Sequence, residues 1–127
     1  MGEFSRLTGE SVENVRTDYP KAIESFISDF NGVLLAKYSP SLVAWESKGC
    51  VNSTGNPGLA TAGSGDVLTG MVASFIAQGM SIEDAAKLGM YIHGKAGDQL
   101  ANAISQRGMI ASDLLTQIGK VISDYES

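Results

Sequence analysis

Apolar positions in the first part of the chain recur at helical spacing. After Pro20, which suits the first turn of a helix, five of them form a stripe typical of one helix face: Ala22, Ile23, Phe26, Ile27 and Phe30. Asp18 or Tyr19 would cap this helix at its start, and Asn31-Gly32 would end it. Shorter helical segments are expected before it, over residues 3–7 and 11–15.

Short apolar runs follow the helix and predict strands. Val33–Ala36 is a continuous apolar run, typical of a strand buried on both faces in an α/β sheet. Leu42–Trp45 predicts a second strand and Cys50–Asn52 a short third. Because Glu46–Gly49 is a polar connection, strands two and three are expected to form a hairpin.

Helical spacing returns for the rest of the chain. The segment after Asp66 is almost wholly apolar, which predicts a buried helix, and Ser81 with Asp84 resembles a capping box at the start of a helix over residues 82–104. Ser112 would cap a last helix. Three glycines interrupt the long helix and suggest close packing against another helix: Gly89, Gly94 and Gly97. The order of helices, strands and then three helices predicts an α/β fold with a short sheet or hairpin.

Composition narrows the functional class. The 127 residues suffice for one domain with a modest core. The net charge of −5 and the pI of about 4.7 argue against nucleic-acid partners and acidic membrane surfaces. The single cysteine, Cys50, excludes an internal disulfide and is typical of a reducing compartment. No apolar run approaches the roughly 20 residues of a membrane span, and no secretory signal is visible, so a cytoplasmic protein is expected.

The chemically suggestive segment is Asn52–Gly70, which is small and polar up to Asp66 and then turns apolar. A glycine-rich turn entering a helix is an anion site, because the first backbone N–H groups of a helix have no partner within it. Gly63 and Gly65 would let the backbone approach an oxyanion closely. A carboxylate beside such a pocket repels a phosphate unless it accepts a proton or contacts a metal, which indicates that Asp66 acts chemically.

Two runs in this segment resemble the signature of the NAD(P)H-hydrate dehydratases, which are the YjeF C-terminal or carbohydrate-kinase-related proteins of the ribokinase-like superfamily. The runs are Thr54–Thr61 and Gly63–Gly70. Further segments are similar to the same family over nearly the whole chain: Gly2-Glu3-Phe4, Tyr91-Ile92-His93-Gly94, Ala96-Gly97-Asp98 and Ala111-Ser112-Asp113-Leu114.

The resemblance implies a lyase that dehydrates hydrated NADH or NADPH and consumes ADP or ATP as co-substrate, with Mg²⁺ arriving on the nucleotide. It implies that Asp66 is the catalytic base and contacts the substrate together with Asn56. It also implies nucleotide and phosphate contacts from the residues after the first strand and from the glycine turn: Lys37, Tyr38, Ser39, Pro40, Ser41, Gly63, Ser64 and Gly65. No metal ligand of the protein itself is expected, because the sequence holds no metal-binding cluster.

The chain resembles only the C-terminal half of the family's ribokinase-like domain. We therefore expect a fragment, one partial domain over residues 1–127 with no second domain, in which the family's substrate-contacting histidine is missing. Tyr38 stands where a glycine is usual, and so does Ala62. A half-domain exposes apolar surface, which favours a homo-oligomer or pairing with the missing half.

Two other functions stay open. One is a ribokinase-like kinase of a small hydroxylated molecule, although the Asn56-Pro57-Gly58 segment argues against it. The other is a fragment that binds nucleotide or oligomerises without catalysis. The simpler interpretations of the remaining polar residues are that His93 packs or forms a hydrogen bond, and that Asp98 and Asp113 are surface or capping residues.

Overall fold

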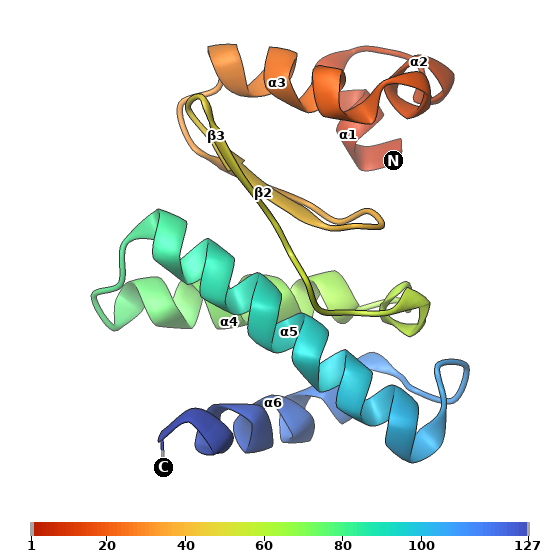
Figure 1. Ribbon diagram of the computed structural model, residues 1–127, viewed down its shortest axis with the longest axis vertical. Coiled ribbons are helices and arrows are strands. Elements are labelled where there is room, and N and C mark those ends of the chain that lie inside the picture. The colour runs from red at the N-terminus through yellow and green to blue at the C-terminus, as the bar shows by residue number, and fades with distance from the viewer. Residues whose placement is uncertain (1, 127) are drawn as a thin grey trace. The chain divides into compact units, whose positions relative to one another are not determined.

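The computed structural model describes residues 2–126, which form the expected α/β fold, with six α-helices and one three-stranded sheet in that range. The chain divides into two compact units, Met1–Val51 and Asn52–Ser127 (Figure 1). The first unit holds three helices and the sheet, and the second holds the remaining helices. The expectation of a single partial domain over residues 1–127 stays a prediction.

The first unit begins with three short helices, α1 (Gly2–Thr8), α2 (Val12–Thr17) and α3 (Tyr19–Asp29). Side-chain caps set two of the starts, because an oxygen acceptor satisfies a backbone N–H that has no partner within the helix. Ser11 Oγ accepts from the N–H of Asn14 at 3.1 Å, and Asp18 Oδ1 accepts from the N–H of Lys21 at 3.2 Å. Of the two capping residues proposed for α3, Asp18 is therefore the one that caps it.

The sheet is antiparallel in the order β1 (Val33–Ala36), β2 (Leu42–Trp45) and β3 (Lys48–Val51). The hairpin of the second and third strands is confirmed, but β3 begins at Lys48 and Asn52 lies outside it. The expected burial of β1 on both faces is wrong, because only Ala36 of its four residues is buried. An apolar run does not show which faces of a strand are covered, and the helical core of this unit packs on the face that carries Ala36.

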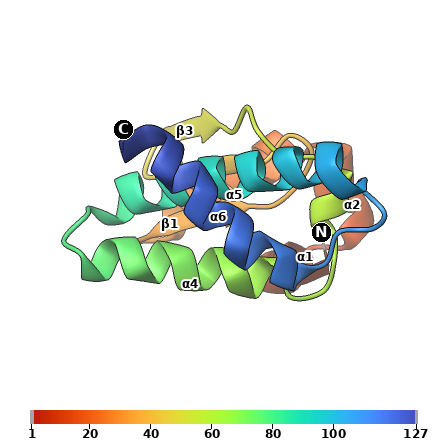
Figure 2. The same ribbon diagram turned by 90° about the horizontal axis from the view of Figure 1, so that it is seen from below.

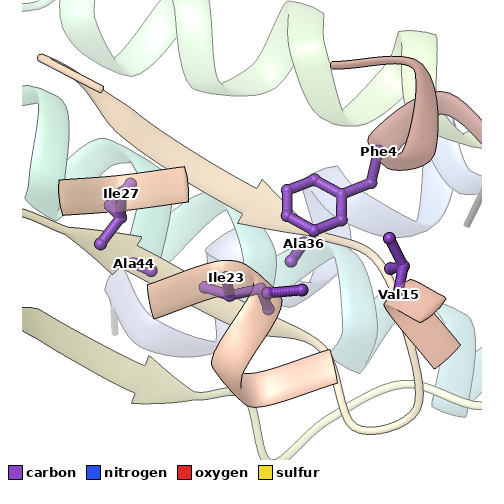
Figure 3. Close-up of a cluster of buried hydrophobic side chains, with 7 residues drawn as sticks. Phe4, Val15, Ile23, Ile27, Ala36 and Ala44 are labelled. Carbon is purple, nitrogen blue, oxygen red and sulfur yellow. The ribbon is translucent and has the colours of Figure 1, made fainter. Parts of the chain in front are cut away.

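The core of the first unit gathers side chains from all three helices and from one face of the sheet (Figure 3). Phe4 packs edge-to-face on Phe26 and Tyr19, with ring centroids 5.5 and 5.9 Å apart. The sheet contributes Ala36 and Ala44, on the alternate positions that point to one face. This core holds the helices against β1 and β2 and so positions the loop between the two strands.

The second unit consists of a 3₁₀ turn, η1 (Pro57–Leu59), and three helices, α4 (Ser64–Ala77), α5 (Ile82–Ile104) and α6 (Ala111–Glu126). The three helices pack on one another (Figure 2). The expected bounds of α5 are confirmed, as is its cap, since Ser81 Oγ accepts from the N–H of Asp84 at 3.2 Å. The long helix supplies much of the buried surface of this unit.

Two expectations for the flanking helices are wrong. The helix α4 is buried along one side only, through Leu68 and Met71, while Ile76 is 39% exposed. The helices α5 and α6 cover one side of α4. The apolar content of a helix does not show how many of its sides will be covered. The last helix begins at Ala111, so Ser112 lies inside its first turn, and the carboxylate of Asp113 accepts from the N–H of Ile110 at 2.9 Å.

The glycines of α5 permit close packing, but mostly against a loop. A Cβ at Gly89 would lie 2.6 Å from a methyl carbon of Val72 in α4, as expected of helix packing. A Cβ at Gly94 would lie 2.7 Å from the carbonyl carbon of Thr54, and one at Gly97 would lie 2.7 Å from the side chain of Leu59. The segment that precedes α4 therefore rests directly on α5.

Within residues 2–126, every helix is too short or too polar to cross a bilayer.

This packing predicts opposite effects for two glycine-to-alanine substitutions. Gly94→Ala should lower the free energy of unfolding by about 1–3 kcal/mol, because the methyl group overlaps the backbone of Thr54. Gly119→Ala in α6, where a Cβ meets nothing within 4 Å, should raise it by about 0.5–1 kcal/mol through helix propensity. Urea unfolding followed by far-ultraviolet circular dichroism measures both. A stabilising Gly94→Ala would contradict the close approach of loop and helix.

Candidate functional site

The glycine turn leads into α4 through a left-handed residue. Gly63 has φ 85° and ψ −14°, a conformation that residues with a side chain rarely adopt, and α4 begins at the next residue, Ser64. No side chain caps this end of the helix. In an α-helix each N–H donates to the carbonyl four residues earlier. For Gly65 and Asp66 that carbonyl lies before the start of α4, so neither N–H has a hydrogen-bond partner within the helix. Together with the helix dipole they form a site that favours an anion.

Asp66 is the third residue of α4 and is exposed, whereas Ser64 is buried. The carboxylate of Asp66 and the backbone amide donors therefore lie in the same helical turn. A group bound at the amides would share this turn with a carboxylate that can take up a proton. The chemical role that the sequence indicated for Asp66 stays a prediction.

A buried histidine holds the first residue of this turn. His93 in α5 is 4% exposed, and its Nε2 lies 3.1 Å from Ser64 Oγ and 3.0 Å from the Ser64 carbonyl oxygen. The interpretation of His93 as a packing and hydrogen-bonding residue is confirmed. The sequence did not identify its partner, which lies 29 residues away at the start of α4.

The loop before η1 is bound to the backbone of the same helix. Asn52 Nδ2 donates to the carbonyl of Met90 at 3.2 Å, and Thr54 Oγ1 donates to the carbonyl of Tyr91 at 2.8 Å. The absence of a side chain at Gly94 makes this approach possible. Asn52 also donates to the carbonyl of Thr54 at 2.9 Å, which fixes the loop internally.

Asp98 orders the next part of this loop. Its Oδ2 accepts from the N–H of Gly55 and its Oδ1 from Nδ2 of Asn56, both at 2.9 Å. Asn56 Oδ1 in turn accepts from the N–H of Gly58 at 3.0 Å. The interpretation of Asp98 as a surface or capping residue is wrong, since it is half-buried and joins α5 to a loop about 40 residues away. Its presence in the Ala96-Gly97-Asp98 segment was the signal for a role in the site.

The residues expected to contact the nucleotide, Lys37–Ser41, form the connection from β1 to β2 in the first unit. Lys37 and Tyr38 are exposed, and Ser41 Oγ donates to the carbonyl of Tyr38 at 3.0 Å. The ring of Tyr38 lies 4.9 Å from that of Tyr19. Burial, and then the proximity of Tyr38, raise the pKa of Tyr19 above its ordinary value. The five residues share one loop, whereas Asn56 and Gly63–Asp66 belong to the second unit.

Groups of three or more His, Cys, Asp or Glu side chains able to hold a metal ion are absent from the described part of the chain, residues 2–126. The donor set of the glycine turn is made of amides, which bind anions rather than cations.

A family model described as NAD(P)H-hydrate dehydratase matches residues 1–120, which include the glycine turn, Asp66 and the loop of Lys37. The chain belongs to the NAD(P)H-hydrate dehydratase family. It is 41% identical over 126 residues to the bifunctional NAD(P)H-hydrate repair enzyme Nnr of Moorella thermoacetica, which covers 98% of this chain and 24% of that protein. It is 40% identical over 114 residues to the ADP-dependent (S)-NAD(P)H-hydrate dehydratase of Neisseria meningitidis serogroup B. That match covers 89% of this chain and 37% of the relative.

A solved structure to which this chain is similar is also that of an NAD(P)H-hydrate dehydratase. The crystal structure of ADP/ATP-dependent NAD(P)H-hydrate dehydratase from Bacillus subtilis, co-crystallised with ATP/Mg²⁺ and soaked with CoA, matches with a TM-score of 0.91 at 25% identity. The match covers 98% of this chain and 46% of that one. The NAD(P)H-hydrate dehydratase resemblance is thus confirmed, and the chain spans less than half the length of these relatives.

Within this family member, Asp98→Asn tests the link between α5 and the loop. The amide places a donor where Gly55 N–H or Asn56 Nδ2 now finds an acceptor, so one bond is lost and a polar group is left without a partner. We expect a loss of about 1–3 kcal/mol in the free energy of unfolding and faster hydrogen exchange of the Gly55 amide by nuclear magnetic resonance. Asp124→Asn, at an exposed position of α6, is the matched control. Equal Gly55 exchange in both variants would refute the role of Asp98.

Proposed function

We propose that this chain carries the phosphoryl-transfer and proton-transfer groups of a dehydratase that converts hydrated NADH or NADPH back to the reduced cofactor with ADP or ATP. The observation that supports it most is the first turn of α4, where the left-handed Gly63, the open amides and Asp66 come together. Family membership supplies the substrate class, since the relatives are named for NAD(P)H-hydrate and for ADP or ATP.

In the proposed reaction, Asp66 removes the proton from the hydroxyl group of the hydrated nicotinamide ring. The hydroxyl oxygen attacks the terminal phosphorus of the nucleotide, and the bond from that phosphorus to the bridging oxygen breaks, which releases the shortened nucleotide. The carbon–oxygen bond then breaks with phosphate as the leaving group. Loss of a ring proton restores the double bond of the dihydronicotinamide, so water is removed overall at the expense of one phosphoanhydride.

The amides of the Gly63–Gly65 turn would bind the oxygens of the transferred phosphoryl group. Their contribution is electrostatic, because fixed donors stabilise charge in the transition state without reorganising. Lys37–Ser41 would contact the adenine nucleotide, and Asn56 with Asp66 the hydrated nicotinamide. Mg²⁺ would enter with the nucleotide phosphates, its usual ligands at such sites.

The central test compares the unsubstituted chain with Asp66→Asn in restoring NADH absorbance from hydrated NADH with ADP or ATP. Asn keeps the volume of Asp but accepts no proton, so we expect the rate to fall by about 10²–10⁴-fold, while calorimetry shows ADP still bound. Glu83→Gln, in the first turn of α5, is the control. Accumulation of a stable phosphorylated product would instead favour a small-molecule kinase, and nucleotide binding without turnover a non-catalytic fragment.

We further propose a cytoplasmic location and association of the chain, with a second copy or with a chain that supplies what the longer relatives carry. Large apolar side chains support association, because Leu7, Val51 and Leu115 are each more than 60% exposed.

Light scattering should therefore give a solution mass above the 13.3 kDa of one chain. Replacing Leu115 by Lys on the exposed side of α6 should lower this mass if that surface takes part, while Leu114, which is fully buried, is left intact. A monomeric mass at all concentrations would contradict self-association.

A further inference from the structure

The hydrogen-bond geometry assigns the proton on His93. Its Nε2 lies within hydrogen-bond distance of two oxygens of the same residue, the carbonyl and the hydroxyl of Ser64, at 3.0 and 3.1 Å. A carbonyl oxygen has no hydrogen and can only accept. Nε2 must therefore carry the hydrogen, and the Ser64 hydroxyl beside it is a second acceptor. The imidazole is the donor that fixes Ser64.

The carbonyl that His93 holds belongs to the peptide group whose N–H is that of Gly65. The C=O of Ser64 and the N–H of Gly65 lie in one rigid plane and point in opposite directions along the helix. Fixing the carbonyl therefore fixes the direction of the Gly65 N–H, which is one of the open amides of the turn. Donation to the carbonyl also polarises the peptide group and strengthens its N–H as a donor.

We infer that His93 is a positioning residue that aims and strengthens the Gly65 amide toward the transferred phosphoryl group. The inference rests on the proposed function, in which that amide binds the phosphoryl oxygens. His93 acts through Ser64 rather than by touching substrate, since both side chains are buried. The fold supports this aim, because α5 is the long helix on which α4 packs.

A buried histidine could instead serve stability alone, and three variants separate the two roles. His93→Leu fills the volume but cannot donate. His93→Gln places an amide nitrogen near the position of Nε2 and can donate to the Ser64 carbonyl. Leu100→Ala, at a buried position about two turns further along α5, weakens the packing of the same helix without altering the donor to Ser64.

The first readout is the Gly65 amide by nuclear magnetic resonance in the whole chain, without substrate. The chain has one histidine, so the imidazole nitrogen signals are unambiguous and should show hydrogen on Nε2. His93→Leu should shift the Gly65 amide proton and reduce its response to added ADP, whereas His93→Gln should preserve most of that response. Leu100→Ala should leave it unchanged.

The second readout is the rate of NADH restoration. We expect His93→Leu to lower kcat by about 10²-fold, as for a small misplacement of a catalytic group, with KM for hydrated NADH nearly unchanged. His93→Gln should recover most of kcat, and Leu100→Ala should keep it despite lower thermal stability. Equal effects of His93→Leu and Leu100→Ala on the Gly65 amide would overturn the positioning role. Absence of turnover by the unsubstituted chain would overturn the proposed function instead, so the two failures are distinguishable.

Discussion

The second unit depends on the close contact between the middle of α5 and the segment that leads to α4. Gly94 leaves space for the backbone of Thr54, and Gly97 leaves space for Leu59. At that distance, side chains of the loop reach the main-chain carbonyls of the helix, as Thr54 does at Tyr91. Contacts with α4, α6 and η1 hold this helix on several sides and restrict its movement. The loop and the glycine turn thus take their positions from a helix that carries ten buried residues.

Two polar residues of α5 also bind the segment that leads to α4 through hydrogen bonds. His93 and Asp98 are five residues apart, about 7.5 Å along the helix axis, and each binds a different part of the segment. His93 binds the start of α4 and Asp98 binds the loop at Gly55 and Asn56. Because both partners are fixed to one rigid helix, the spacing between the loop and the turn is fixed as well. Under the proposed function, groups held in this way would lose little entropy when a ligand binds.

Much of the local structure could be predicted from the sequence because local rules govern it. Periodicity and a serine cap gave the bounds of α5, and a polar connection between two apolar runs gave the hairpin of β2 and β3. Burial was predicted less well, as at β1 and α4, because an apolar segment does not reveal which of its sides has a neighbour. The partners of His93 and Asp98 could not be predicted, since they lie 29 and 43 residues away and no pattern along the chain encodes such contacts. The glycine turn could be recognised from the sequence because its residues, from Gly63 to Asp66, are consecutive along the chain.

In the proposed reaction, the interaction between Asp66 and the phosphate oxygens changes when the proton is transferred. As a carboxylate, Asp66 repels the phosphate oxygens that the amides attract, which disfavours a bound nucleotide when no substrate is present to give up a proton. When the hydroxyl of the hydrated ring transfers its proton, Asp66 becomes neutral as negative charge reaches the phosphoryl oxygens. The repulsion then disappears in the transition state while the attraction to the amides remains. Interactions that improve between ground state and transition state are those that accelerate a reaction. A carboxylate on the same turn as the anion donors is therefore suited to catalysis rather than to tight binding of the nucleotide.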